Sequence, residues 1–78
     1  MEHPLRVLRE NKGLTQSQCG KVVGLAGSVI SQIECGSYKP SNKQLEKIAT
    51  AFKLDMVEFV QSVTEYYHIE QHKHPIST

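Results

Sequence analysis

The stretch GKVVGLAGSVISQIECG, residues 20–36, decides the fold because it combines helical periodicity with many glycines. It holds four of the chain's five glycines, although glycine weakens a helix interior by about 1 kcal/mol relative to alanine. Apolar residues nevertheless recur through it at helical spacing. We therefore expect two short helices, over residues 16–23 and 27–34, joined by a tight turn at which glycine has a steric purpose.

Two glycines, one inside the helix expected over residues 16–23 and one directly after it, have different expected roles. Gly24 ends the helix in a left-handed conformation that other residues adopt only at a cost of about 1 kcal/mol or more. Gly20 lies one turn earlier, on the face that the next helix crosses, where a side chain would hold the helices apart. Leu25, Ile30 and Ile33 then fill the wedge between them. This arrangement is the helix-turn-helix of DNA-binding proteins, and the alternative is an unrelated helical hairpin.

Three further helices are predicted from helix start and stop signals and from the spacing of apolar residues. A first helix starts at Pro4 and stops before Gly13. Capping boxes, Ser or Thr followed three residues later by Gln, start helices at Thr15 and Ser41, and residues 55–58 open a fifth helix in the same way. No segment alternates as a strand does, so the fold class is all-α, a compact five-helix bundle. The residues expected inside it are Leu5, Leu8, Cys19, Val22, Val23, Leu45, Ile48, Ala49, Phe52, Met56 and Phe59.

The length of the chain allows one domain. The chain has 78 residues and two cysteines in unlike contexts, which argues against a disulfide framework and for a reducing cytoplasm. No apolar run reaches the roughly 20 residues of a membrane span, and the first residues lack the apolar stretch of a signal peptide. We expect a helix-turn-helix domain over residues 1–62 and a helical extension with a loosely ordered tail over residues 63–78.

Charge is distributed unevenly although its net value is only +1. Residues 1–54 carry eight basic and four acidic groups, a net of +4, and residues 55–78 carry one basic and four acidic groups, a net of −3. A basic body indicates a polyanionic partner; an ordinary mixed surface is the alternative.

Several spaced motifs in residues 4–60 carry a family resemblance: NKGLTQ, ISQIECGSYKPS and LEKIATAF. In these the chain resembles the Cro/CI-type repressors of the XRE family, whose lambda-repressor-like domain has five helices and binds DNA, usually as a dimer. Cys19 and Gly20 stand where that family more often has leucine and alanine. Ala26 replaces the usual Ser or Thr cap, which leaves the start of the recognition helix poorly capped.

The resemblance places base-reading positions at Gly27, Ser28 and Gln32. Gln32 is the strongest reader, because its amide can pair bidentately with adenine and discriminate by about 1–3 kcal/mol. Gly27 can read nothing but permits close approach to DNA, and Val29 either packs at the helix edge or touches a thymine methyl group. Without Arg, Lys or Asn on this helix, part of the specificity is expected from DNA shape. A merely solvated polar face is the alternative.

Phosphate contacts are expected from a separate set of residues: Gln16, Ser31, Ser37, Tyr38, Lys39 and Lys43. For any one lysine, a role in solubility is an equal alternative. By the resemblance, Arg9 and Glu34 form an internal ion pair that joins the first helix to the end of the third.

The predicted function is sequence-specific binding of an inverted repeat in double-stranded DNA by a homodimeric repressor, without catalysis, cofactor or membrane. Its control is expected from another protein or from its own concentration. The dimer contact is expected at Val60, Val63 and Tyr67. The alternative is a module of the same fold that docks a protein instead of DNA. A metal site at His68, His72 and His74 is conceivable from spacing, but no cysteine joins them and we expect no metal.

Overall fold

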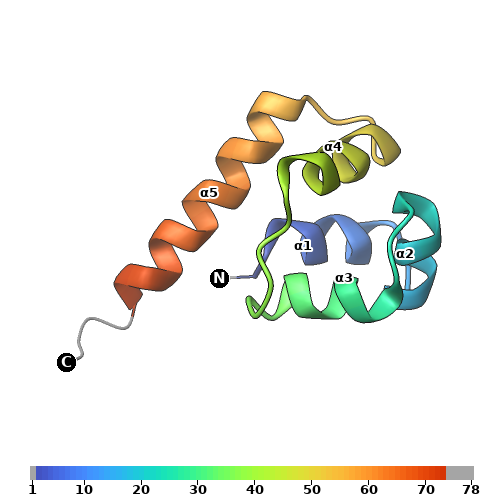
Figure 1. Cartoon of the computed structure of the whole chain (residues 1–78), viewed down its shortest axis with the longest axis horizontal. Coiled ribbons are helices and arrows are strands. Elements are labelled where there is room, and N and C mark those ends of the chain that lie inside the picture. Colours follow the sequence, from blue (N-terminus) through green and yellow to red (C-terminus); the bar gives the residue numbers. More distant parts are fainter. Residues whose placement is uncertain (1, 74–78) are drawn as a thin grey trace.

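The computed structural model describes residues 2–73, and the side chains of residues 2–69, as five α-helices without a strand in that range. The expected all-α class is confirmed, and the helices enclose one core (Figure 1). The helices are α1 (Pro4–Asn11), α2 (Gln16–Val23), α3 (Gly27–Glu34), α4 (Asn42–Ala51) and α5 (Met56–Lys73).

The helix ends follow the local sequence. Thr15 and Ser41 form complete capping boxes at the starts of α2 and α4, so two otherwise unpaired amides are satisfied at each end. Gly24 ends α2 with φ of 81°, the left-handed conformation expected of it. Ala26 precedes α3 and makes no side-chain capping bond, whereas an Asp55 carboxylate oxygen accepts the amide of Glu58 at 3.0 Å to cap α5.

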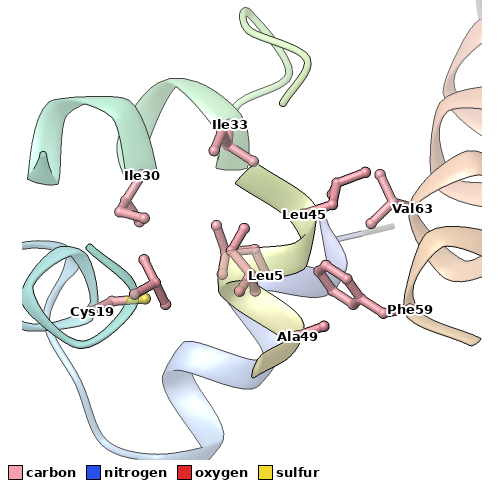
Figure 2. Close-up of a cluster of buried hydrophobic side chains, with 10 residues drawn as sticks. Leu5, Cys19, Ile30, Ile33, Leu45, Ala49, Phe59 and Val63 are labelled. Carbon is pink, nitrogen blue, oxygen red and sulfur yellow. The ribbon is translucent and has the colours of Figure 1, made fainter. Parts of the chain in front are cut away.

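The core draws side chains from all five helices (Figure 2). Burying an aliphatic side chain stabilises a fold by about 1.5–3 kcal/mol, so a short chain needs each helix to contribute. Cys19 is a small buried core residue, as expected. The fully buried aliphatic side chains are Leu5, Ile30, Ile33 and Ile48.

Two expectations about packing are wrong. Val22 was expected inside but is 51% exposed, because its place on the short α2 helix faces away from the core. Val63 was assigned to a dimer contact but is only 3% exposed, in the core beside Phe59. Helix α5 runs without a break across the expected boundary between residues 62 and 63 and continues to Lys73, so the described part of residues 63–78 is helical.

Helix α5 is fastened to the N-terminus through His3, which is 1% exposed. The Nδ1 atom of His3 accepts the amide of Leu5 at 3.0 Å and so caps α1. This bond leaves Nε2 as the protonated nitrogen of the neutral ring, 3.4 Å from the hydroxyl of Tyr67. The ring also packs edge-on against Tyr66, with centroids 4.8 Å apart. Burial lowers the pKa of His3 from 6.5 to about 4.

Candidate nucleic-acid interface

Close contact between backbones fixes the angle of α3 against α2. A Cβ atom at Gly20 would collide with the carbonyl oxygen of Leu25 and lie 3.1 Å from the amide nitrogen of Gly27. The amides of Gly24 and Leu25 both bond to the Gly20 carbonyl oxygen at 2.8 Å. Gly20 is therefore the contact glycine that its position predicts, and α3 is held as a short rod across the end of α2.

Gly27 has a different role from the one expected. A Cβ atom there would lie 3.2 Å from the Cα atom of Ser17, so this position points at the first turn of α2 and not outward. The close approach that it permits is between two helices of the protein. The glycine at position 27 thus serves the contact between α2 and α3, and not the close approach to DNA that was expected of it.

The outer face of α3 is polar. Ser28 and Gln32 are exposed and lie one turn apart, and Ser31 is half-buried beside them. Val29 is half-buried against the core, which supports the packing role over a thymine contact. The exposed side chains of α3 thus offer a hydroxyl group and an amide, groups that can donate and accept at base edges.

The predicted ion pair is present and links α1 to the end of α3. Two nitrogens of Arg9 donate to the two carboxylate oxygens of Glu34, at 2.7 and 3.1 Å, a bidentate geometry. These bonds raise the pKa of Arg9 above its usual value. Only 5% of the Glu34 side chain is exposed, and Arg9 also donates to the carbonyl oxygen of Leu14 at 2.8 Å.

Gln16, expected to contact phosphate, is held by the same ion pair. Its Nε2 atom donates to a Glu34 carboxylate oxygen at 3.2 Å, and its side chain is half-buried at the first position of α2. This bond restricts the Gln16 amide to one orientation at a helix N-terminus, where phosphate is favoured.

The loop after α3 folds back on the helix. The carbonyl oxygen of Gln32 accepts the amides of Ser37 and Tyr38, at 3.1 and 3.2 Å, and the Ser37 hydroxyl at 3.3 Å. A hydrogen bond from Ser37 lowers the pKa of the exposed Cys35 thiol. The Tyr38 hydroxyl donates to Gln44 at 2.8 Å, within the capping box of α4.

Sequence reasoning missed Gln44 as the partner of Tyr38, and it missed His3 altogether. The Gln44 signal was available, because the side chain of a capping-box residue is directed at the loop before its helix. No comparable signal marks His3, because the tyrosines that pack on its ring lie more than sixty residues away along the chain.

The two predicted phosphate-binding lysines differ in their surroundings. Lys39 is exposed, and its ammonium lies 5.1 Å from the centre of the Tyr67 ring, a cation–π distance. Lys43 is exposed in the first turn of α4. His68 is exposed on α5, whereas the side chain of His72 and all of His74 lie outside the described residues.

Comparison with known proteins agrees with this geometry. A helix-turn-helix family model matches residues 5–59. The chain belongs to the XRE-type helix-turn-helix family. It is also 36% identical over 63 residues to the ImmF control region 10 kDa protein of Bacillus phage phi105, covering 81% of this chain and 68% of that relative.

Membership in the helix-turn-helix family makes this chain a DNA-binding regulator. The helix-turn-helix expected from the sequence corresponds to α2 and α3, whose backbones are in close contact at Gly20 and Gly27. In the described part of the chain, none of the helices has the length and apolar character that crossing a bilayer requires.

Proposed function

We propose that the chain represses transcription by binding an inverted-repeat operator as a homodimer, with α3 in the major groove. The observation that carries this proposal is the exposure of Ser28 and Gln32 on a helix that backbone contacts hold rigidly against α2. Occupancy of a promoter suffices for repression, so no chemistry is needed. The phage relative is described by its name as a control-region protein, which supports a regulatory role here.

Base reading is assigned to Gln32 first and Ser28 second. An amide pairs bidentately with adenine, whereas a hydroxyl accepts or donates and is less selective. Ser31, half-buried between them, is assigned to the DNA backbone.

Phosphate contact is assigned to Gln16, Ser37, Tyr38, Lys39 and Lys43. Their common support is position: Gln16 is oriented at the start of α2, and the others lie in the loop after α3 or at the start of α4. These contacts set the register of the protein on the duplex and carry no sequence information themselves.

The homodimer contact is assigned to one face of α5. Val57, 65% exposed, joins half-buried Val60 and Tyr67 on that face, three, seven and ten residues apart in helical register. Val63 is excluded because it is in the core. Two copies joined there would present two α3 helices to half-sites about one helical turn, roughly 34 Å, apart.

A second candidate function is docking of a protein on α3, and one observation favours it. In the described part of the chain, α3 carries no Arg or Lys, the residues that most often read guanine. Salt dependence separates the two functions, because DNA affinity falls by about 0.9 log unit per phosphate contact for each log unit of salt.

The test of the proposed function is selection of binding sites from a random duplex-DNA pool by the full chain. The expected result is a two-fold symmetric motif, and the absence of any enriched sequence would contradict the proposal. Gln32→Ala should then blur preference at one base pair of each half-site. Lys43→Ala should weaken all sequences alike and reduce the salt slope by about 1, whereas Lys53→Ala, at the opposite end of α4, should not.

Dimerisation is tested by sedimentation with and without the selected DNA. The Val57→Asp, Val60→Asp double variant should sediment as a monomer and lose cooperative binding to the two half-sites. Val22→Asp, at a valine of α2 that is 51% exposed, is the control. Unchanged sedimentation of the double variant would remove this face of α5 from the dimer contact.

A further inference from the structure

A groove of about 380 Å³ lies between α1 and the first half of α5. No residue of α2 or α3 lines it, so it is separate from the proposed DNA interface. Its apolar surface comes from both helices and the loop between α4 and α5. One of its apolar residues, Val7, is 41% exposed. The other apolar residues that line the groove are Pro4, Leu8, Leu54 and Phe59.

The charged residues that line the groove are all acidic. Four carboxylates line it, at Glu2, Asp55, Glu58 and Glu65, and all four residues are exposed. Among the described residues that line it, none is Lys or Arg. The neighbouring cation on α1, Arg6, is paired with Glu10 at 3.1 Å. The groove is therefore an apolar channel with an acidic rim.

We propose that this groove binds a basic amphipathic segment of another protein, in which one or two apolar side chains enter the channel and flanking Lys or Arg residues meet the rim. Such a segment complements the groove in two ways: its apolar side chains fill the apolar channel, and its positive charges pair with the carboxylates of the rim. Grooves between helices take the apolar face of an amphipathic helix in this way. The basic flanks give the specificity and the rate of association.

Two other occupants fit the groove less well. DNA is excluded by charge, because four carboxylates repel a polyanion. A second copy related by a two-fold axis would bring the same four carboxylates against themselves, since such an interface pairs each patch with its own copy. The partner is thus a third component, and its binding leaves α3 available to DNA. The groove proposal does not depend on the repressor or homodimer assignments.

The test begins with a displayed library of random 16-residue peptides, selected on the immobilised full chain. The expected winners combine apolar residues at helical spacing with several Lys or Arg. Enrichment of peptides without basic residues, or no enrichment at all, would overturn the proposal. A synthetic winning peptide then serves as the probe in fluorescence anisotropy, with its Lys and Arg residues changed to Glu as the negative control.

Two matched pairs of variants locate the bound peptide. Glu65→Lys, on the rim, should weaken the peptide about tenfold, while Glu46→Lys, an equally large charge change on α4 outside the groove, should leave its affinity within twofold. Val7→Ser should weaken it severalfold, while Val22→Ser, at the exposed valine of α2, should not. Thermal unfolding shows that each variant is folded. Equal effects within either pair would overturn the proposal.

Sedimentation of the chain without peptide distinguishes a second copy from a third component. If Glu65→Lys and Val7→Ser leave self-association unchanged, the groove is not where two copies meet. If both abolish it, the occupant is a second copy and the proposal is wrong. The DNA affinity of Val7→Ser, measured in parallel, should equal that of the parent.

Discussion

The α2–α3 unit and the junction of α1 with α5 are held by different kinds of contact. Between α2 and α3 the backbones themselves touch, at Gly20 and Gly27. Between α1 and α5 the contacts are made by large side chains, among them His3, Tyr66 and Tyr67. The first contact has no room for adjustment, and the second depends on the ionisation and packing of its side chains.

This difference suits the two proposed surfaces. A helix that reads base edges must be held in one orientation. Two features hold α3 in this way: its backbone contacts with α2 and the buried ion pair of Glu34 with Arg9. The α1–α5 junction is not required to hold one fixed orientation. Its side chains bury His3 but leave a groove beside Val7. Four substitutions test the comparison.

The largest effect is expected from Gly20→Val. Because the neighbours of the added side chain are backbone groups of Leu25, Ala26 and Gly27, it can be accommodated only if α3 moves away from α2. We expect a loss of about 4 kcal/mol in the free energy of unfolding, near the upper end for single substitutions. Urea unfolding measures it. Lys21→Val adds the same side chain at the next, exposed position and should change stability by less than about 1 kcal/mol.

The second effect is expected from Glu34→Ala, which removes the bidentate partner of Arg9, a side chain only 13% exposed, and leaves it a 3.9 Å contact with Glu10. Removing one member of a buried pair costs about 3 kcal/mol or more. Glu46→Ala, at an exposed glutamate of α4, is the control and should cost little. Glu34→Ala should also weaken DNA binding, because Gln16 loses the bond that orients it. Loss of stability without loss of DNA affinity would remove Gln16 from the phosphate contacts.

The comparison also explains what could be predicted from the sequence. The α2–α3 unit was predictable because its determinants are local: a capping box at Thr15, a turn glycine at Gly24 and a contact glycine at Gly20. Glycine inside a helix is a strong signal, because it costs stability unless space requires it. Even here Gly27 was misplaced, since its orientation depends on the crossing angle of the helices and not on spacing within α3.

The α1–α5 junction was hidden because its determinants are distant in the sequence. His3 meets Tyr66 and Tyr67 only after the chain has folded, and histidine is outside the usual capping residues. Val63 was misassigned for a related reason. Helical periodicity shows that Val63 and Phe59 share a face of α5, but it does not show whether the core or a second copy covers that face.

The third effect concerns pH and should be confined to the α1–α5 junction. Below pH 6.5 the unfolded chain binds a proton at His3, while the folded chain keeps the ring neutral down to about pH 4. Stability is therefore lost as pH falls through this window, by about 2 kcal/mol at pH 5. Urea unfolding at pH 7, 6 and 5 measures this loss.

His3→Asn is the matched variant for the pH experiment, because asparagine can still cap α1 and does not titrate. Its stability should depend less on pH over the same window. The other histidines are common to both proteins, so the difference between the two curves isolates His3. Parallel curves would show that His3 does not set the pH dependence.

The smallest effect is expected from Ala26→Ser, which sharpens the contrast within the α2–α3 unit. Thr15 caps α2 fully, whereas Ala26 gives α3 no side-chain cap. At φ of −66° and ψ of 147° the backbone of residue 26 is already in the conformation of a cap, so a serine hydroxyl can accept an amide of the first turn without rearrangement. We expect a gain of about 0.5–1 kcal/mol in thermal and urea unfolding, and a similar loss for Thr15→Ala. If Ala26→Ser gains nothing while Thr15→Ala loses, the first turn of α3 is held by its packing on α2 at Gly20 and Gly27 and needs no cap.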